Sequence, residues 1–145
     1  MQVDITDQRL SRSYGDLGRT GIIHREYQIY RLSVGPHRAF SMWPEALGFA
    51  AANDPGLTRR FGEVVRQEYE AVDIRESLAP QADLATEPRW ARANGTFGED
   101  VDTAKRMVEA YVAGIQNGAD GLNSGSVVAV VKHWVGYGAA KDEYV

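Results

Sequence analysis

The sequence predicts an α/β fold in which parallel strands are joined by crossover helices. Two observations lead to this prediction. Two long amphipathic segments begin with helix-capping residues, and short strand-like runs precede, separate and follow them. This alternation indicates parallel pairing, because a parallel neighbour is reached through a crossover and not through a tight turn. Such crossovers are right-handed in nearly all proteins.

The first predicted strand is Tyr27–Val34 (YQIYRLSV), where apolar and polar residues alternate, and Gly35 and Pro36 end it. Around this strand, residues 9–40 contain six arginines and no lysine. Such a segment is typical of a phosphate-binding arm or, more often, of solvated arginines on irregular structure. We therefore assign no function to residues 1–42 and treat them as a divergent N-terminal segment.

Proline and aspartate mark where the first two helices begin. Pro44 suits the first turn of a short helix that runs through Leu47. Asp54 is placed to cap a longer helix, and Pro55 suits its first position, where an N–H would have no partner in the helix. The apolar face of this longer helix is predicted to consist of Leu57, Phe61, Val64, Val65 and Val72.

A second strand, a third helix and a third strand follow. The second strand is predicted at Ser77–Pro80, and after a long polar segment Asp100 caps the helix, which ends just before Gly118. The last strand, Val127–Val131, is expected to be buried on both faces because it does not alternate. The inner face of the helix is predicted to consist of Val101, Ala104, Val108, Tyr111, Val112 and Ile115.

Length and composition limit the protein classes that fit. The chain has 145 residues and a net charge of −4, which suits one globular domain or part of one and gives no sign of nucleic-acid binding. It has no cysteine, and His24, His37 and His133 are too far apart for a local metal site, so no metal or cofactor is predicted. No apolar run reaches the roughly 20 residues that span a bilayer, and no signal peptide is recognisable. No membrane partner is therefore predicted, and the compartment stays unknown.

In folds of this class, functional groups gather where parallel strands end, which here means after Pro80 and after Val131. Three blocks of the chain, two of them at these strand ends, resemble the barrel domain of glycoside hydrolase family 3, which includes β-glucosidases and related exo-acting enzymes. The blocks are WPEALGFAAANDP, PQADLATEPRWARANGTFGED and VVKHWVGYGAAKD. The resemblance covers Trp43 to about Asp142. It implies that residues 43–145 form part of a (β/α)8 TIM barrel, a fold that typically needs about 250 residues.

The resemblance also implies a substrate-binding set. Arg92 matches the second arginine of the family's D-P-R-W-G-R motif, and Lys132 and His133 match its K-H pair. In the family these side chains hold the hydroxyl groups of the sugar that is cleaved. The side-chain chemistry suits that role, because arginine and lysine offer only donors, whereas a neutral histidine offers one donor and one acceptor.

Adjacent side chains on a regular strand point to opposite faces, so Lys132 and His133 could not both reach one sugar from an ideal strand. We therefore expect the strand to end at Val131 and the backbone to turn sharply there, for example through a non-proline cis peptide bond. Asp83 is expected to organise its loop by accepting backbone hydrogen bonds. Two residues depart from the family pattern, since Ala91 and Gly35 stand where relatives carry glycine and a sugar-binding aspartate.

The family resemblance implies a retaining mechanism with an aspartate nucleophile and a second acid. Both are expected beyond Val145, so no catalytic residue is assigned here and the isolated chain is predicted to be inactive. The expected partners are a small-molecule or oligosaccharide substrate and either the remaining barrel strands or a second copy. Two alternatives stay open: a lyase that forms a Schiff base on Lys132, and a non-catalytic carbohydrate-binding remnant.

Overall fold

A computed structural model describes residues 41–133 and Gly136. The predicted strand Tyr27–Val34 and the departure at Gly35 lie outside these residues. The described elements, in chain order, are α3 (Ala46–Ala52), α4 (Pro55–Ala71), β1 (Glu76–Ser77), the 3-10 helix η2 (Ala93–Gly95), α5 (Val101–Ile115) and β2 (Val128–Ala129). None of the helices in this part of the chain is both long and apolar enough to cross a membrane.

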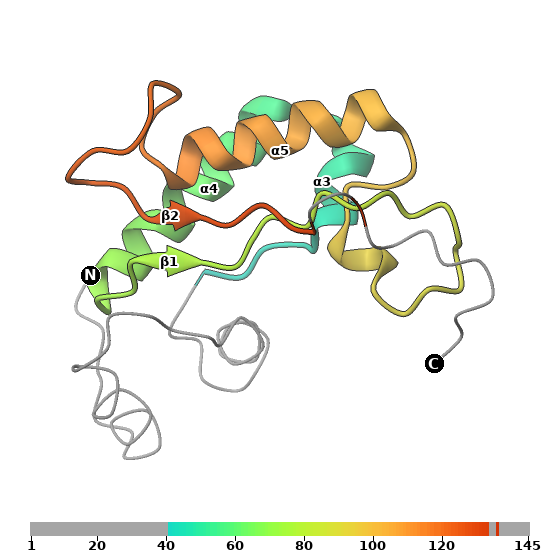
Figure 1. Ribbon diagram of the computed structural model, residues 1–145, viewed down its shortest axis with the longest axis horizontal. Coiled ribbons are helices and arrows are strands. Elements are labelled where there is room, and N and C mark those ends of the chain that lie inside the picture. Colours follow the sequence, from blue (N-terminus) through green and yellow to red (C-terminus); the bar gives the residue numbers. More distant parts are fainter. Residues whose placement is uncertain (1–40, 134–135, 137–145) are drawn as a thin grey trace, which may run out of the picture.

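The two described strands pair in parallel, with Glu76 opposite Val128 and Ser77 opposite Ala129. Helix α5 lies between them in the sequence, so β1, α5 and β2 form the predicted crossover unit. Figure 1 shows α4 and α5 side by side on the same side of the two strands, with both arrows directed toward the loop that carries η2. The predicted α/β fold with parallel strands and crossover helices is thus confirmed.

Both predicted aspartate caps are present. Asp54 Oδ1 accepts a hydrogen bond from Leu57 N at 3.0 Å, and Pro55 is the first residue of α4. Asp100 Oδ1 accepts from Thr103 N at 2.7 Å at the start of α5. Hydrogen bonding by the Thr103 side chain, together with this bond from its backbone amide, holds the pKa of Asp100 below its ordinary value, because both favour the charged carboxylate.

Helix α3 differs from its prediction. It begins at Ala46, after Pro44, and continues to Ala52, beyond the predicted end at Leu47. Asn53 then adopts the left-handed conformation, with φ of 49°, and its N–H bonds back to the carbonyl groups of Phe49 and Ala50. The helix therefore ends at a residue type that tolerates this backbone geometry, directly before the cap of α4.

Two facing glycines bring α4 and α5 into close contact. A Cβ built at Gly62 would lie 2.6 Å from the carbonyl oxygen of Tyr111, and one built at Gly114 would clash with the carbonyl oxygen of Arg59. Any larger residue at either position would push the helices apart, because the obstructing atoms are backbone. This contact was not part of the sequence prediction.

The core forms between these helices and the strands, and it corrects part of the predicted helix faces. Val101 is 61% exposed and Leu57 is 38% exposed, because both lie in the first turn of their helix. Met107, absent from the prediction, is fully buried and its Sδ contacts Thr58 Oγ1 at 3.2 Å. The buried hydrophobic cluster consists of Phe49, Phe97, Ala104, Met107, Tyr111, Ile115 and Val127.

The predicted strand Val127–Val131 is shorter and less buried than expected. Val127 is fully buried, but Val128 is 38% exposed and Val131 is 45% exposed. The prediction of burial on both faces is therefore wrong for the part of the chain described. Among the described helices, α5 packs against β2.

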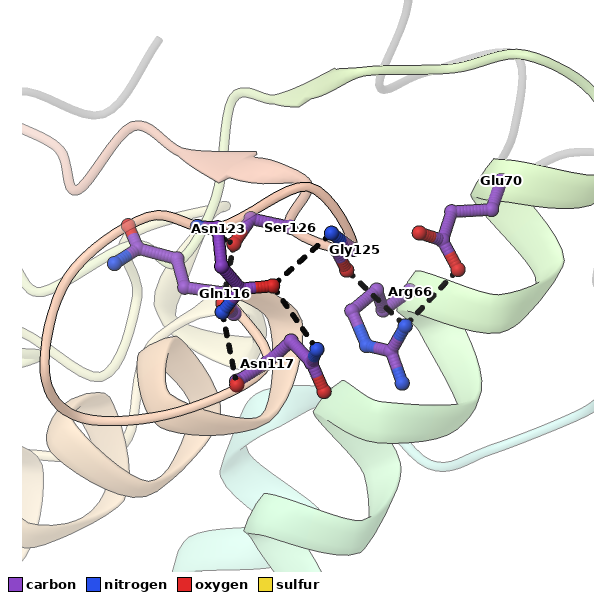
Figure 2. Close-up of polar contacts among 7 residues, drawn as sticks. All are labelled: Arg66, Glu70, Gln116, Asn117, Asn123, Gly125 and Ser126. Carbon is purple, nitrogen blue, oxygen red and sulfur yellow. Dashed lines mark hydrogen bonds and ion pairs between the residues drawn. The ribbon is translucent and has the colours of Figure 1, made fainter.

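The loop between α5 and β2 is tied to both helices (Figure 2). Helix α5 ends as predicted just before Gly118: the N–H of Gly118 bonds to Ala113 O at 2.9 Å, and the preceding Asn117 has φ of 60°. At the far end of the loop, Ser126 Oγ donates to Gln116 O at 2.6 Å.

Arg66 of α4 fixes the same loop from the other side. Its Nη1 atom donates to Gly125 O at 3.1 Å and to Glu70 Oε2 at 2.9 Å, as Figure 2 shows. The start of β2 is therefore anchored to α4 as well as to α5. This anchoring sets the position of the strand that leads to Lys132.

Candidate functional site

A cavity of about 430 Å³ opens beside the end of β1. Aromatic side chains from three helices form much of its wall, including Phe49 of α3, Phe61 of α4 and Tyr111 of α5. The chain that follows β1 and the loop that carries η2 supply polar groups, among them Gln81 and Arg92. The cavity therefore combines an apolar wall with a few polar groups, as binding sites for small molecules commonly do.

Backbone pairing beyond the strand ladder places Lys132 at this cavity. Lys132 N donates to Pro80 O at 3.0 Å, and Lys132 O accepts from Ala82 N at 2.6 Å. The predicted sharp turn is present as a cis peptide bond between Lys132 and His133. Lys132 lies on the cavity wall.

Arg92 reaches the same cavity from the loop after β1. It precedes η2, and its Nη2 atom donates to Gln81 Oε1 at 3.2 Å. The backbone of Gln81 bridges both Thr96, which is fully buried, and Lys132. Gln81 therefore connects the two predicted site residues, through its side chain to Arg92 and through its backbone to Lys132.

Glu87 is engaged by a different arginine. Both of its carboxylate oxygens accept hydrogen bonds from the guanidinium group of Arg89, at 2.8 Å and 3.0 Å. The side-chain hydrogen bonds from Arg89 lower the pKa of Glu87 from 4.5 to about 2. Arg89 thus keeps the Glu87 carboxylate charged and hydrogen-bonded to its own guanidinium group. The guanidinium group of Arg92 contacts Gln81 at the cavity instead.

His133 is held outside the cavity wall by Asp83. His133 Nδ1 lies 2.7 Å from Asp83 Oδ2, and His133 N donates to Asp83 Oδ1 at 3.4 Å. Asp83 is only 2% exposed, whereas the His133 side chain is 33% exposed. Asp83 accepts a backbone hydrogen bond, but the donor is the N–H of His133, fifty residues later in the chain, whereas the prediction concerned its own loop. Its contact with the imidazole ring was not predicted, and it fixes the orientation of that ring.

The structure therefore brings two of the three predicted site residues to one cavity. Arg92 and Lys132 both line it. His133 follows Lys132 directly in the chain but does not line the cavity. Two carboxylates also line it: Glu45 at the start of α3, and Glu68, which accepts from Ser41 N at 2.7 Å. Within the described residues, no cluster of three metal-ligating side chains occurs.

Sequence reasoning missed a set of buried polar atoms on the cavity wall. Trp43 Nε1, Ser77 Oγ and Gln81 Nε2 are buried and have no hydrogen-bond partner among the described residues. Buried polar groups are nearly always hydrogen-bonded, so these atoms mark places where a partner is expected. The available signal was positional, since Ser77 and Gln81 lie at and just after a strand end.

Comparison with known proteins confirms the resemblance to glycoside hydrolase family 3. Residues 32–144 match the glycosyl hydrolase family 3 N terminal domain. The chain is 67% identical over 111 residues to a periplasmic β-glucosidase/β-xylosidase of Dickeya chrysanthemi, covering 77% of this chain and 16% of the relative. It is 52% identical over 99 residues to β-glucosidase C of Emericella nidulans, covering 68% of this chain and 16% of the relative.

The fold agrees with a solved structure. An exo-1,3/1,4-β-glucanase from a Pseudoalteromonas species superimposes with a TM-score of 0.66 and 35% sequence identity, over 70% of this chain and 13% of that chain. The described helices and parallel strands thus form part of a TIM-barrel domain. The chain spans about a sixth of the length of the relatives that it matches.

Proposed function

Because the chain belongs to glycosyl hydrolase family 3, we propose that it forms part of the site at which a β-glucosidase-like enzyme holds the terminal sugar of its substrate. The observation that supports this proposal is the position of Arg92 and Lys132. They come from two different loops, line one cavity and are connected through Gln81. A pyranose carries closely spaced hydroxyl groups, which suit two convergent cationic donors.

In this proposal Arg92 and Lys132 donate to sugar hydroxyl oxygens, and His133 supplies a further contact at the edge of the site. Each hydrogen bond that involves a charged group contributes about 1.5–3 kcal/mol. Asp83 holds the His133 ring, so that its orientation is set before the sugar arrives. These groups orient the substrate and do not themselves cleave the glycosidic bond.

Hydrolysis with retention needs two carboxyl groups about 5–5.5 Å apart, one acting as nucleophile and one as acid and base. None of the carboxylates in the described residues matches a motif for either role. We therefore propose that this chain alone binds a sugar without turning it over. Cleavage would need further barrel strands, supplied by additional sequence or by another chain.

The two-stranded sheet supports the need for further strands, because no described strand pairs with either of its outer edges. Strands with uncovered edges tend to pair with other chains, and the exposed side chains of Val128 and Val131 add apolar surface. Association through this surface, with additional barrel strands or with a second copy, is part of the proposal. Sedimentation of the purified chain would measure it.

Two measurements on the purified chain test the proposed function. Calorimetric titration with D-glucose is expected to show saturable binding that is lost in Arg92→Ala and Lys132→Ala. An assay with an aryl β-glucoside is expected to show no turnover. Absence of glucose binding would refute the sugar-binding role, whereas clear hydrolysis would refute the claim that the catalytic carboxyl groups come from elsewhere. Arg75→Ala is a matched control, because Arg75 pairs with Asp73 and does not line the cavity.

A further inference from the structure

Gln81 lies between the two cationic residues of the cavity and has a donor that no described residue uses. Its Oε1 atom accepts from Arg92, its backbone pairs with Lys132, and its Nε2 atom is buried and unpaired. We propose that Gln81 binds the sugar directly, as a neutral donor alongside Arg92 and Lys132. This inference rests on the proposed function of the cavity and adds a residue that determines affinity and specificity.

The contact with Arg92 determines which way the Gln81 amide points. A guanidinium group has donors and no acceptor, so the amide oxygen and not the nitrogen must face Arg92. The observed 3.2 Å contact between Arg92 Nη2 and Gln81 Oε1 satisfies this requirement. The two hydrogens of Nε2 are thereby turned away from Arg92, on a side chain that lines the cavity.

Burial makes the unpaired amide nitrogen informative. Gln81 is only 9% exposed, and Nε2 itself is inaccessible and has no partner in the described part of the chain. An exposed amide in this position would simply be solvated, whereas a buried donor without a partner is unfavourable. Because this atom is itself inaccessible, the amide or its neighbours must move slightly before an oxygen atom of a ligand in the cavity can satisfy it.

The position of Gln81 is held before any ligand binds. Its backbone bridges Thr96 on one side and Lys132 on the other. Gly95 leaves room for the amide, since a Cβ at that position would lie 3.3 Å from Gln81 Oε1. The backbone that carries this donor therefore loses little conformational freedom when a ligand binds, which favours affinity.

The chemistry of the donor indicates the ligand group. Nε2 is neutral and offers only N–H donors, so its partner is an oxygen acceptor such as a sugar hydroxyl or the ring oxygen. A hydroxyl that accepts from Gln81 keeps its own hydrogen for another bond. The sugar position that faces Gln81 would therefore be recognised by the presence of an oxygen atom, and a deoxy sugar would lose that contact.

Substitutions at Gln81 test the inference with D-glucose as the probe. Gln81→Met keeps the length of the side chain and removes the amide, and it is expected to weaken binding roughly 3- to 10-fold, the effect of one neutral hydrogen bond. Gln81→Glu keeps an acceptor for Arg92 but removes the N–H donors, and it is expected to weaken binding at least as much. Gln67→Glu is the matched control, because Gln67 is exposed on α4 and does not line the cavity.

A measurement on the unmodified chain guards against misfolded variants. In a ¹⁵N-labelled sample, the side-chain amide resonances of Gln81 should shift on saturation with D-glucose, and those of Gln67 should not. Monodeoxy glucoses extend the test. The analogue whose loss of affinity disappears in Gln81→Met identifies the hydroxyl that contacts Gln81, because the two changes then remove the same interaction.

The outcomes separate the two proposals. If the unmodified chain binds D-glucose while the Gln81 variants bind equally well and the Gln81 amide resonances do not move, the Gln81 inference is wrong and the proposed function stands. If the unmodified chain does not bind D-glucose, the proposed function is refuted and the inference falls with it. Weakened binding in both Gln81 variants, with the control unchanged, supports the direct contact.

Discussion

Replacing Asp83 with asparagine should change both the protonation pattern and the hold on His133. Asp83 Oδ2 lies 2.7 Å from His133 Nδ1, and the carboxylate is almost fully buried. An ionised carboxylate accepts hydrogen bonds only, so neutral His133 should carry its proton on Nδ1 and leave Nε2 as an acceptor. In Asp83→Asn the amide can present a donor to Nδ1, and the proton is then free to move to Nε2.

The expected loss of stability follows from the exposure of the two groups. A hydrogen bond to a charged group contributes about 1.5–3 kcal/mol, but His133 is one-third exposed, so solvent compensates for part of the loss. We expect the free energy of unfolding to fall by about 1–2 kcal/mol, a value toward the lower end of this range. Urea denaturation measures this quantity, and Asp73→Asn is a suitable control because Asp73 is exposed and pairs only with Arg75 in the described interactions.

Measuring the tautomer of the His133 ring tests the role of Asp83 more specifically than measuring stability does. At a pH where His133 is neutral, ¹⁵N chemical shifts of its ring should show mainly the Nδ1–H form in the unmodified chain and a smaller share in Asp83→Asn. A merely structural role for Asp83 would lower stability without changing the tautomer. An unchanged tautomer ratio would therefore refute the reasoning, even if the variant were less stable.

Three further predictions concern the frame around the site. Gly114→Ala should destabilise the chain by about 1–2 kcal/mol in urea denaturation, because overpacking between α4 and α5 outweighs the helix preference of alanine; equal or greater stability would contradict the close contact. Asp100→Ala should cost about 1 kcal/mol through loss of the helix cap, whereas Asp100→Asn should cost less. The pKa of Glu87 is lowered to about 2, so its stabilising pair with Arg89 should be fully present above about pH 4.5 and lost as the pH falls toward 2. Titration of the Glu87 carboxyl by NMR checks the value, and Arg89→Ala should raise it toward 4.5 without restoring it fully, because the backbone N–H of residue 89 still donates to Glu87 Oε1.

The helices could be predicted from sequence because their signals are local. Asp54 with Pro55, and Asp100, satisfy the first amides of α4 and α5 from within a few residues. The packing between these helices could not be predicted in the same way. Gly62 and Gly114 are weak helix formers, and their value appears only when the two helices are placed against each other.

The strands were harder to predict, because their burial depends on parts of the protein that are distant in the sequence. The apolar run at Val127–Val131 has the composition of a strand buried on both faces, yet how much of it is buried depends on elements that cover it from elsewhere. An apolar composition favours burial, but the elements packed against the strand determine how much of it is buried. Met107 is a different case, because its spacing from Ala104 and Tyr111 places it on the same inner face of α5, so the helical pattern itself indicated its burial.

The site shows how far a motif can identify residues and where geometry must take over. The K-H pair and the arginine motif identified Arg92 and Lys132, which both reach the cavity. Neither motif indicates Gln81, because a glutamine in a loop has no sequence signal of its own. Its significance comes from Arg92, eleven positions later in the chain, which engages its amide oxygen and leaves its buried nitrogen without a partner. In the proposal made for Gln81, such a residue contacts the sugar from beside the motif residues while lying outside the motif.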